Sequence, residues 1–184
     1  MDTQTLYQRT IKFAALKHLE NGQTIPGTNI PYVVHLSNVA MEVLVASAHS
    51  TNFDINFAVQ IALLHDTLED TSTTFEELTH EFGIEVSNAV LALTKNSNLS
   101  KEEKMIDSLT RVKACKKEVW AVKLADRVTN LQEPPLLWDN LKKQEYLREA
   151  GIILKELEGC NDYLESRLKE KIGEYNKYIS QALA

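Results

Sequence analysis

Apolar residues recur at helical spacing along most of the chain, and the strict apolar–polar alternation of a half-buried strand is scarce. Only six glycines and four prolines interrupt the pattern. The predicted helices cover residues 5–20, 32–48, 54–70, 74–83, 84–95, 100–116, 119–132, 140–158 and 161–182.

Local signals support several of these boundaries. Thr74 with Glu77, and Ser100 with Glu103, have the spacing of a capping box, in which each residue satisfies a free N–H at the start of a helix. Gly83 is typical of a helix C-terminus. No linker or internal repeat divides the chain, so the sequence predicts one all-α domain of about eight or nine helices over residues 1–184.

The stretch "IALLHDTLED", residues 61–70, places four polar side chains on a helix that also has an apolar stripe. His65 and Glu69 share one row of that helix and Asp66 and Asp70 the next, so the four side chains form a continuous wall. Buried carboxylates are costly unless they are paired or bind a metal. A divalent cation would also relieve their mutual repulsion.

Further ligands would have to come from other segments. His35 lies at the start of an apolar helix, and Asp126 is embedded in the apolar run "VWAVKLADRVTNL". Each also has a structural interpretation, as a hydrogen-bonded core histidine and as an ion pair with the next residue. His18, His49 and His80 lack acidic neighbours in the sequence and are interpreted as structural.

Composition excludes several classes of partner. The net charge of −6 over 184 residues gives no global attraction to nucleic acid or to anionic membranes. The two cysteines lie far apart, and the chain has neither a signal-peptide pattern nor an apolar run of about 20 residues. We therefore expect a cytoplasmic protein in which a local feature, such as a metal ion, attracts any anionic substrate.

Three segments together resemble one family. They are "IPYVVHLSNVA", "ALLHDTLEDTSTTFEELTHEFGIEVSNAVLALTK" and "VKLADRVTNL", and they are similar to the hydrolase domain of RelA/SpoT-type alarmone enzymes, which are HD-domain metal-dependent phosphohydrolases. The resemblance covers roughly residues 5–160. The length is similar to that of the stand-alone small alarmone hydrolases, including the metazoan SpoT-homologue type, and leaves no residues for a synthetase.

The resemblance implies a metal site and a cofactor. The family's ligands correspond to His35, His65, Asp66 and Asp126, and its usual metal is Mn²⁺. Two imidazoles and two carboxylates also suit Fe²⁺, Co²⁺ or Zn²⁺.

The resemblance also implies roles for residues around the metal. Glu69 and Asp70 correspond to the acids that position and deprotonate the attacking water. Asn130 corresponds to a residue near the nucleotide ribose or phosphate, and Tyr146 to one near the substrate. Arg127 is a further substrate-binding candidate, with an ion pair as its structural interpretation.

The expected activity is removal of the 3′-pyrophosphate from a purine alarmone, (p)ppGpp or (p)ppApp. One departure from the family leaves the base of the substrate, guanine or adenine, open. Family members that act on guanosine alarmones commonly have a basic stretch before PYxxH, whereas here no Arg or Lys lies between Lys17 and His35. The alternatives are an HD-domain 5′-nucleotidase and a non-catalytic nucleotide-sensing module. The implied partner is a small nucleotide, with no nucleic acid and no membrane, and the oligomeric state stays open.

Overall fold

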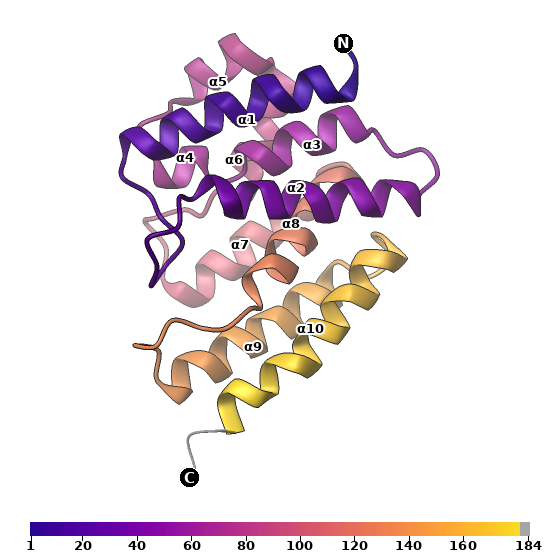
Figure 1. Ribbon diagram of the computed structural model, residues 1–184. Coiled ribbons are helices and arrows are strands. Elements are labelled where there is room, and N and C mark those ends of the chain that lie inside the picture. The colour runs from indigo at the N-terminus through magenta and orange to yellow at the C-terminus, as the bar shows by residue number, and fades with distance from the viewer. Residues whose placement is uncertain (181–184) are drawn as a thin grey trace.

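The computed structural model describes residues 1–180 of the chain as an assembly of helices (Figure 1). Ten helices lie within these residues: α1 Thr3–Glu20, α2 Val33–Ala48, α3 Ile55–Leu64, α4 Thr67–Asp70, α5 Phe75–Phe82, α6 Ile84–Leu93, α7 Lys101–Lys113, α8 Lys117–Asn130, α9 Asn140–Glu156 and α10 Asp162–Ser180. The prediction of an all-α fold is confirmed. The last two residues of the helix predicted over 161–182 lie outside the described part.

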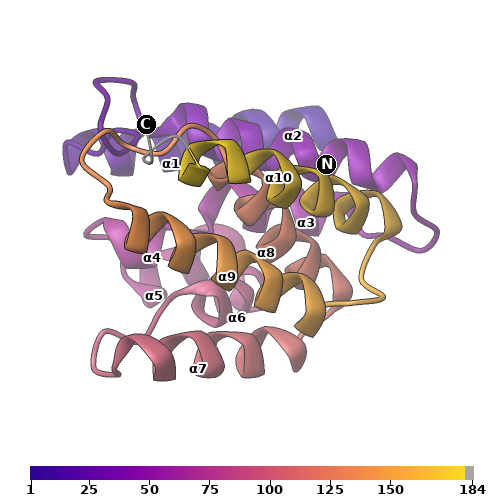
Figure 2. The same cartoon turned by 90° about the horizontal axis from the view of Figure 1, so that it is seen from below.

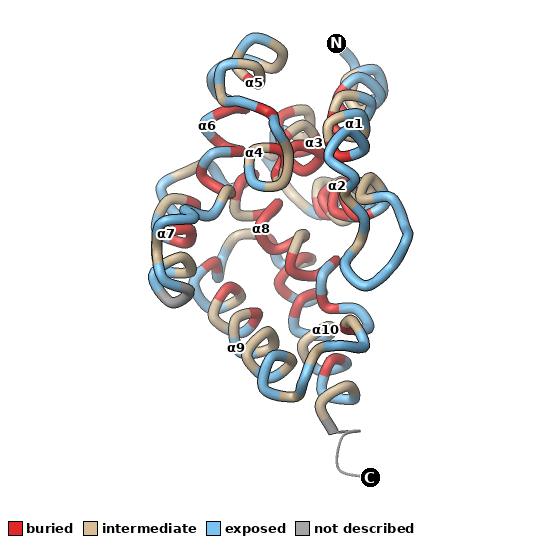
Figure 3. The backbone as a smooth tube through the Cα atoms, turned by 90° about the vertical axis from the view of Figure 1, so that its left-hand side faces the viewer, coloured by how far each residue is buried: buried red, intermediate tan, exposed pale blue. Residues whose placement is uncertain are grey.

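Helix α8 lies at the centre of the packing. It contacts α2, α3 and α10, while α2 also packs on α3, and α9 packs on α10. Figures 2 and 3 show α8 enclosed by these helices, and the colouring of Figure 3 shows buried residues concentrated on α2, α3 and α8. Because the apolar residues of these helices form one hydrophobic cluster, the polar groups they carry inward are held on a rigid frame.

No helix within residues 1–180 has the length and apolar content that crossing a membrane requires.

The helix predicted across residues 54–70 is divided in two. Helix α3 ends at Leu64 and α4 begins at Thr67, so His65 and Asp66 occupy the turn between them. The Thr67 hydroxyl donates to the main-chain oxygen of Leu64 at 2.7 Å. Such side-chain bonds to helix carbonyls compete with the regular helical ladder. The helix is therefore interrupted at the two residues that the sequence predicts to be metal ligands.

The two predicted capping boxes have different outcomes. Ser100 and Glu103 form the complete box at the start of α7. Thr74 caps α5 by accepting from the main-chain N–H of Glu77, as predicted. The Glu77 carboxylate instead contacts the Lys17 ammonium at 2.6 Å, which ties α5 to α1.

Candidate metal centre and active site

Four candidate ligands from three parts of the chain converge. His35 comes from α2, His65 and Asp66 from the turn between α3 and α4, and Asp126 from α8. The Nε2 atoms of His35 and His65 lie 3.4 Å apart. Asp126 Oδ1 lies 3.4 Å from the first of these nitrogens and 3.6 Å from the second. Asp66 Oδ2 lies 3.0 Å from His65 Nε2 and 3.7 Å from His35 Nε2.

This arrangement fits a single divalent ion. Metal–nitrogen and metal–oxygen bonds of about 2.0–2.2 Å place neighbouring ligand atoms roughly 3 Å apart, as they are here. Within residues 1–180, His35, His65 and Asp126 form a group whose ligand atoms all lie within 4.8 Å of one another. The mixed nitrogen and oxygen donor set, without cysteine, is typical of catalytic sites with open positions.

The His65 ring is oriented by the last turn of α3. Its Nδ1 lies 2.8 Å from the main-chain oxygen of Ala62. A carbonyl oxygen can only accept, so Nδ1 carries the proton and donates it. When the ring is neutral, as a metal ligand must be, the lone pair of Nε2 therefore points to the site.

Two further side chains hold the carboxylates of the site. The Tyr32 hydroxyl donates to Asp66 Oδ2 at 2.5 Å, and the Tyr32 ring stacks on the buried His18 ring with centroids 4.7 Å apart. The Asn130 amide donates to Asp126 Oδ1 at 2.5 Å, in agreement with their i, i+4 spacing. The sequence interpretation did not assign a role to Tyr32, although it is the tyrosine of the PYxxH motif.

The imidazoles and carboxylates of the candidate metal site shift the pKa values of His65, Asp66 and Asp126 strongly. Burial alone would lower the pKa of His65, but the carboxylates of Asp66 and Asp126 raise it well above its usual range. Burial would likewise raise the pKa of both carboxyls, but the imidazoles lower it below the usual range. The site therefore stabilises positive charge at its centre, which a divalent cation supplies when it replaces the protons.

The two acids predicted to handle water have different surroundings. Both oxygens of Glu69 are hydrogen-bonded to Lys95, whose ammonium lies 2.9 Å from Oε1 and whose main-chain N–H lies 2.9 Å from Oε2. Asp70 is partly buried, and burial together with the negative charges of Asp66 and Glu69 raises its pKa to about 6. The Glu69–Lys95 pair was not predicted, because 26 residues separate its members in the sequence.

We expect Asp70→Asn to stabilise the metal-free protein at pH 7. The Asp70 carboxyl has a pKa of about 6 when folded against its ordinary 3.8, so the folded state binds more protons between these values. Its stability cost is therefore absent at low pH, grows as pH rises from about 4 to 6, and is fully present above. The uncharged amide removes that cost. Thermal unfolding should show a midpoint about 2–4 °C higher at pH 7. An equal shift at pH 3 would contradict the ionic origin.

Two cavities flank the metal centre on either side of Asn130. The first, of about 400 Å³, is lined by His35, by the loops before α2 and after α8, which include Ile25 and Trp138, and by Tyr146 of α9. Its lining is mostly apolar or uncharged, which suits the flat faces of a nucleobase.

The second cavity, of about 310 Å³, is cationic. Its lining includes Asp126 and five basic side chains, which are Lys95, Lys104, Lys123, Arg127 and Lys142. Burial lowers the pKa of Lys123. A chain whose net charge is −6 thus concentrates positive charge beside its candidate metal ligands, where an anionic group would be attracted.

The predicted substrate residues Tyr146 and Arg127 contact each other. The Arg127 guanidinium lies 4.3 Å from the centroid of the Tyr146 ring, and its Nη2 lies 3.5 Å from Glu149 Oε2. Arg127 is only 7% exposed, so its structural interpretation as an ion pair describes its surroundings well. Tyr146 lines both cavities and lies where the two meet.

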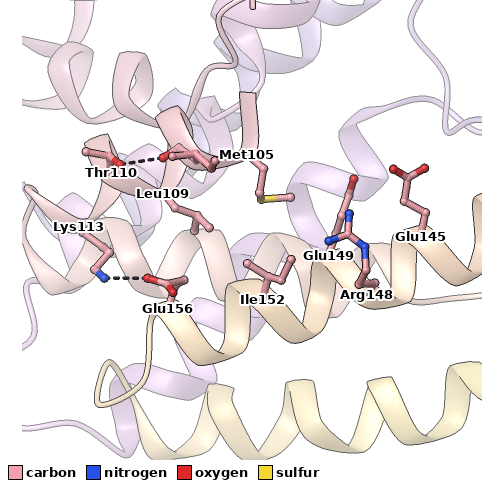
Figure 4. A pocket seen from close by; sticks show the side chains of 10 residues that line it. Met105, Leu109, Thr110, Lys113, Glu145, Arg148, Glu149, Ile152 and Glu156 are labelled. Atoms are coloured by element: carbon pink, nitrogen blue, oxygen red, sulfur yellow. Dashed lines mark hydrogen bonds and ion pairs between the residues drawn. The ribbon is translucent and has the colours of Figure 1, made fainter. Parts of the chain in front are cut away.

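A larger cavity of about 610 Å³ lies between α7 and α9, away from the ligand cluster (Figure 4). Met105, Leu109 and Ile152 project into it, and Lys113 pairs with Glu156 at one end at 2.8 Å. It contains neither histidine nor any candidate ligand. Size alone therefore does not identify the site.

Comparisons with known proteins agree with the geometry. The family model described as an HD domain matches residues 11–153. The chain is 36% identical over 166 residues to guanosine-3′,5′-bis(diphosphate) 3′-pyrophosphohydrolase MESH1 of Danio rerio, covering 88% of this chain and 89% of that one. The same enzyme of Homo sapiens is 36% identical over 162 residues, covering 85% and 87%.

A solved structure extends the likeness to three dimensions. It is that of a metazoan ortholog of SpoT, which is reported to hydrolyse ppGpp and to play a role in starvation responses. It aligns with a TM-score of 0.78 and 27% identity over 92% of this chain and 94% of that chain. The chain therefore belongs to the HD-domain family and, within it, to the group of the MESH1 pyrophosphohydrolases.

Proposed function

We propose that this protein is a metal-dependent hydrolase that removes the 3′-pyrophosphate of a purine nucleotide alarmone, (p)ppGpp or (p)ppApp. The observation that carries the proposal is the cluster of His35, His65, Asp66 and Asp126 at the boundary between a mostly uncharged and a cationic cavity. The relatives named above, which are guanosine-3′,5′-bis(diphosphate) 3′-pyrophosphohydrolases, support it.

The two cavities suggest how the nucleotide lies. The base enters the mostly uncharged cavity, where Trp138 and Tyr146 offer aromatic faces for stacking. The phosphates extend toward the lysines of the cationic cavity. Asn130 lines both cavities and donates one amide N–H to Asp126, and its second N–H would donate to the ribose or to a phosphate oxygen.

Each group of residues then has a separate role in the hydrolysis. A divalent ion held by the four ligands would lower the pKa of a water and stabilise charge on the phosphoryl oxygens. Glu69 and Asp70 orient that water and accept its proton. Its oxygen attacks the phosphorus attached to the sugar, and the bond from that phosphorus to the 3′-oxygen breaks. The 3′-oxygen takes up a proton, from the protonated acid or from solvent, to become the free hydroxyl, and pyrophosphate leaves intact. Lysines of the cationic cavity that do not bind Glu69, such as Lys104 and Lys142, hold the pyrophosphate in line for this displacement.

Mn²⁺ is the metal that we propose, and the nitrogen and oxygen donors also accept Fe²⁺, Co²⁺ or Zn²⁺. We further propose that residues 1–184 act as one catalytic domain in the cytoplasm on a small-molecule substrate.

A panel of substrates tests the proposal against its rivals. Purified protein loaded with Mn²⁺ should release pyrophosphate from ppGpp or ppApp and nothing from nucleoside 5′-monophosphates. Orthophosphate released from 5′-monophosphates alone would favour the 5′-nucleotidase. Nucleotide binding without metal retention or turnover would favour the sensing module.

The adenine alarmone should be hydrolysed at least as well as the guanine one. No Arg or Lys occurs between Lys17 and His35, and the loop that lines the base cavity is uncharged over residues 21–34. The cavity therefore lacks a charged group on this side that would read the guanine edge. Values of kcat/KM measured side by side would contradict this if they favoured ppGpp by more than about tenfold, or about 1.4 kcal/mol.

A further inference from the structure

Lys95 lies just beyond the end of α6 and binds both oxygens of the Glu69 carboxylate in α4. The Lys95 side chain is 53% exposed and that of Glu69 is 26% exposed. Ion pairs as exposed as this one contribute little to folding stability. We therefore expect the Lys95–Glu69 pair to affect the orientation of the Glu69 carboxylate more than the stability of the fold.

The segment that carries Lys95 is itself fixed. Arg111 of α7 donates to the main-chain oxygens of Ala92 and Thr94 at 2.8 Å each. Asp107 holds the same guanidinium through two contacts of 2.9 and 2.7 Å. Arg111 thus clamps the C-terminal end of α6, and the main-chain N–H of Lys95 starts from a defined position.

This contact leaves Glu69 able to act on water. A carboxylate oxygen has two lone pairs, and Lys95 occupies one on each oxygen. The remaining lone pairs can accept hydrogen bonds from a water. Without the ammonium, only the main-chain N–H of Lys95 would hold the Glu69 carboxylate, through Oε2, and Oε1 could rotate away from its present position.

We propose that Lys95 is a positioning residue for hydrolysis, which holds the Glu69 carboxylate in the orientation that binds the attacking water. Lys95 also lines the cationic cavity beside Asp126 and Asn130, so its ammonium lies between the water-handling acid and the place expected for the phosphates. The proposal rests on the proposed function in one respect, which is that Glu69 acts on the water.

A double-mutant cycle separates positioning from direct phosphate binding. Lys95→Met, which keeps the length of the side chain, should lower kcat by about ten- to a hundredfold with little change in KM, because small misplacements of catalytic groups cost this much. Lys95→Arg should restore most of kcat. In a Glu69→Gln background, Lys95→Met should cost less than about twofold, because its partner is already lost.

Two matched variants serve as controls. Lys104→Met removes another lysine of the same cavity, for which no contact with Glu69 is present, and should raise KM more than it lowers kcat. Lys113→Met breaks an exposed Lys–Glu pair of similar geometry with Glu156 and should leave both constants unchanged. A Lys95→Met effect confined to KM, or one of equal size with and without Glu69→Gln, would overturn the positioning role.

A second readout does not depend on turnover. Crystal structures of metal-loaded wild type and Lys95→Met should show the Glu69 carboxylate ordered in the first and displaced in the second. An unchanged carboxylate would overturn the proposal even if the protein proved to act on another nucleotide. Absence of pyrophosphate release by the wild type would instead count against the proposed function.

Discussion

Asp66→Ala and His65→Ala are expected to abolish bound metal and activity together. Each removes one of four candidate ligands, and the two residues are adjacent in the turn between α3 and α4. Each replacement also leaves the neighbouring buried charges without a partner. Loss of a ligand should exceed the about 10–100-fold cost in metal affinity that loss of an outer-shell partner carries. Elemental analysis and pyrophosphate release measure the two effects on the same preparations.

His80→Ala provides the matched control. The His80 side chain is 85% exposed on α5, and no candidate ligand contacts it. The variant should retain both metal and turnover. Stoichiometric metal in both Asp66→Ala and His65→Ala would contradict the assignment of these residues as ligands.

Glu69→Gln should keep the metal but lose most of the turnover. The amide preserves the shape of the side chain while removing the negative charge and half of the acceptor capacity. Loss of a general base typically lowers kcat by about 10²–10⁴-fold. Steady-state kinetics on metal-loaded protein, with metal content measured in parallel, provides the comparison.

The control for Glu69→Gln is Glu156→Gln. Glu156 likewise pairs with a lysine, Lys113, but lies at the end of α9 in the cavity between α7 and α9. Its replacement should change neither metal content nor kcat. Near-normal turnover of Glu69→Gln would show that Glu69 takes no part in the reaction.

Much of the fold could be predicted because helical spacing and caps are local. The capping box of Ser100 and the cap of Thr74 act within four residues, so the sequence contains all of their partners. The break at His65 and Asp66 was missed. Periodicity detects which face is apolar, and it does not detect the side-chain bonds to main-chain oxygens that end α3.

The candidate site likewise combines features that the sequence predicts with features that depend on tertiary packing. The histidine and aspartate candidates could be selected because acids and histidines within apolar helices need a compensating partner. The cationic cavity could not be predicted, because its lysines come from α7, α8, α9 and the end of α6, and the total charge of the chain is negative. The link from Lys95 to Glu69 likewise depends on how α4 packs on α6.

Phosphorus NMR of the reaction in ¹⁸O-labelled water tests the proposed chemistry most directly. Metal-loaded protein is mixed with ppGpp or ppApp, and a metal-depleted sample serves as the blank. The expected products are pyrophosphate carrying the label and an unlabelled nucleoside 5′-diphosphate, formed only in the loaded sample. Orthophosphate as the first product, label in the nucleotide, or equal turnover without metal would contradict a metal-dependent 3′-pyrophosphohydrolase.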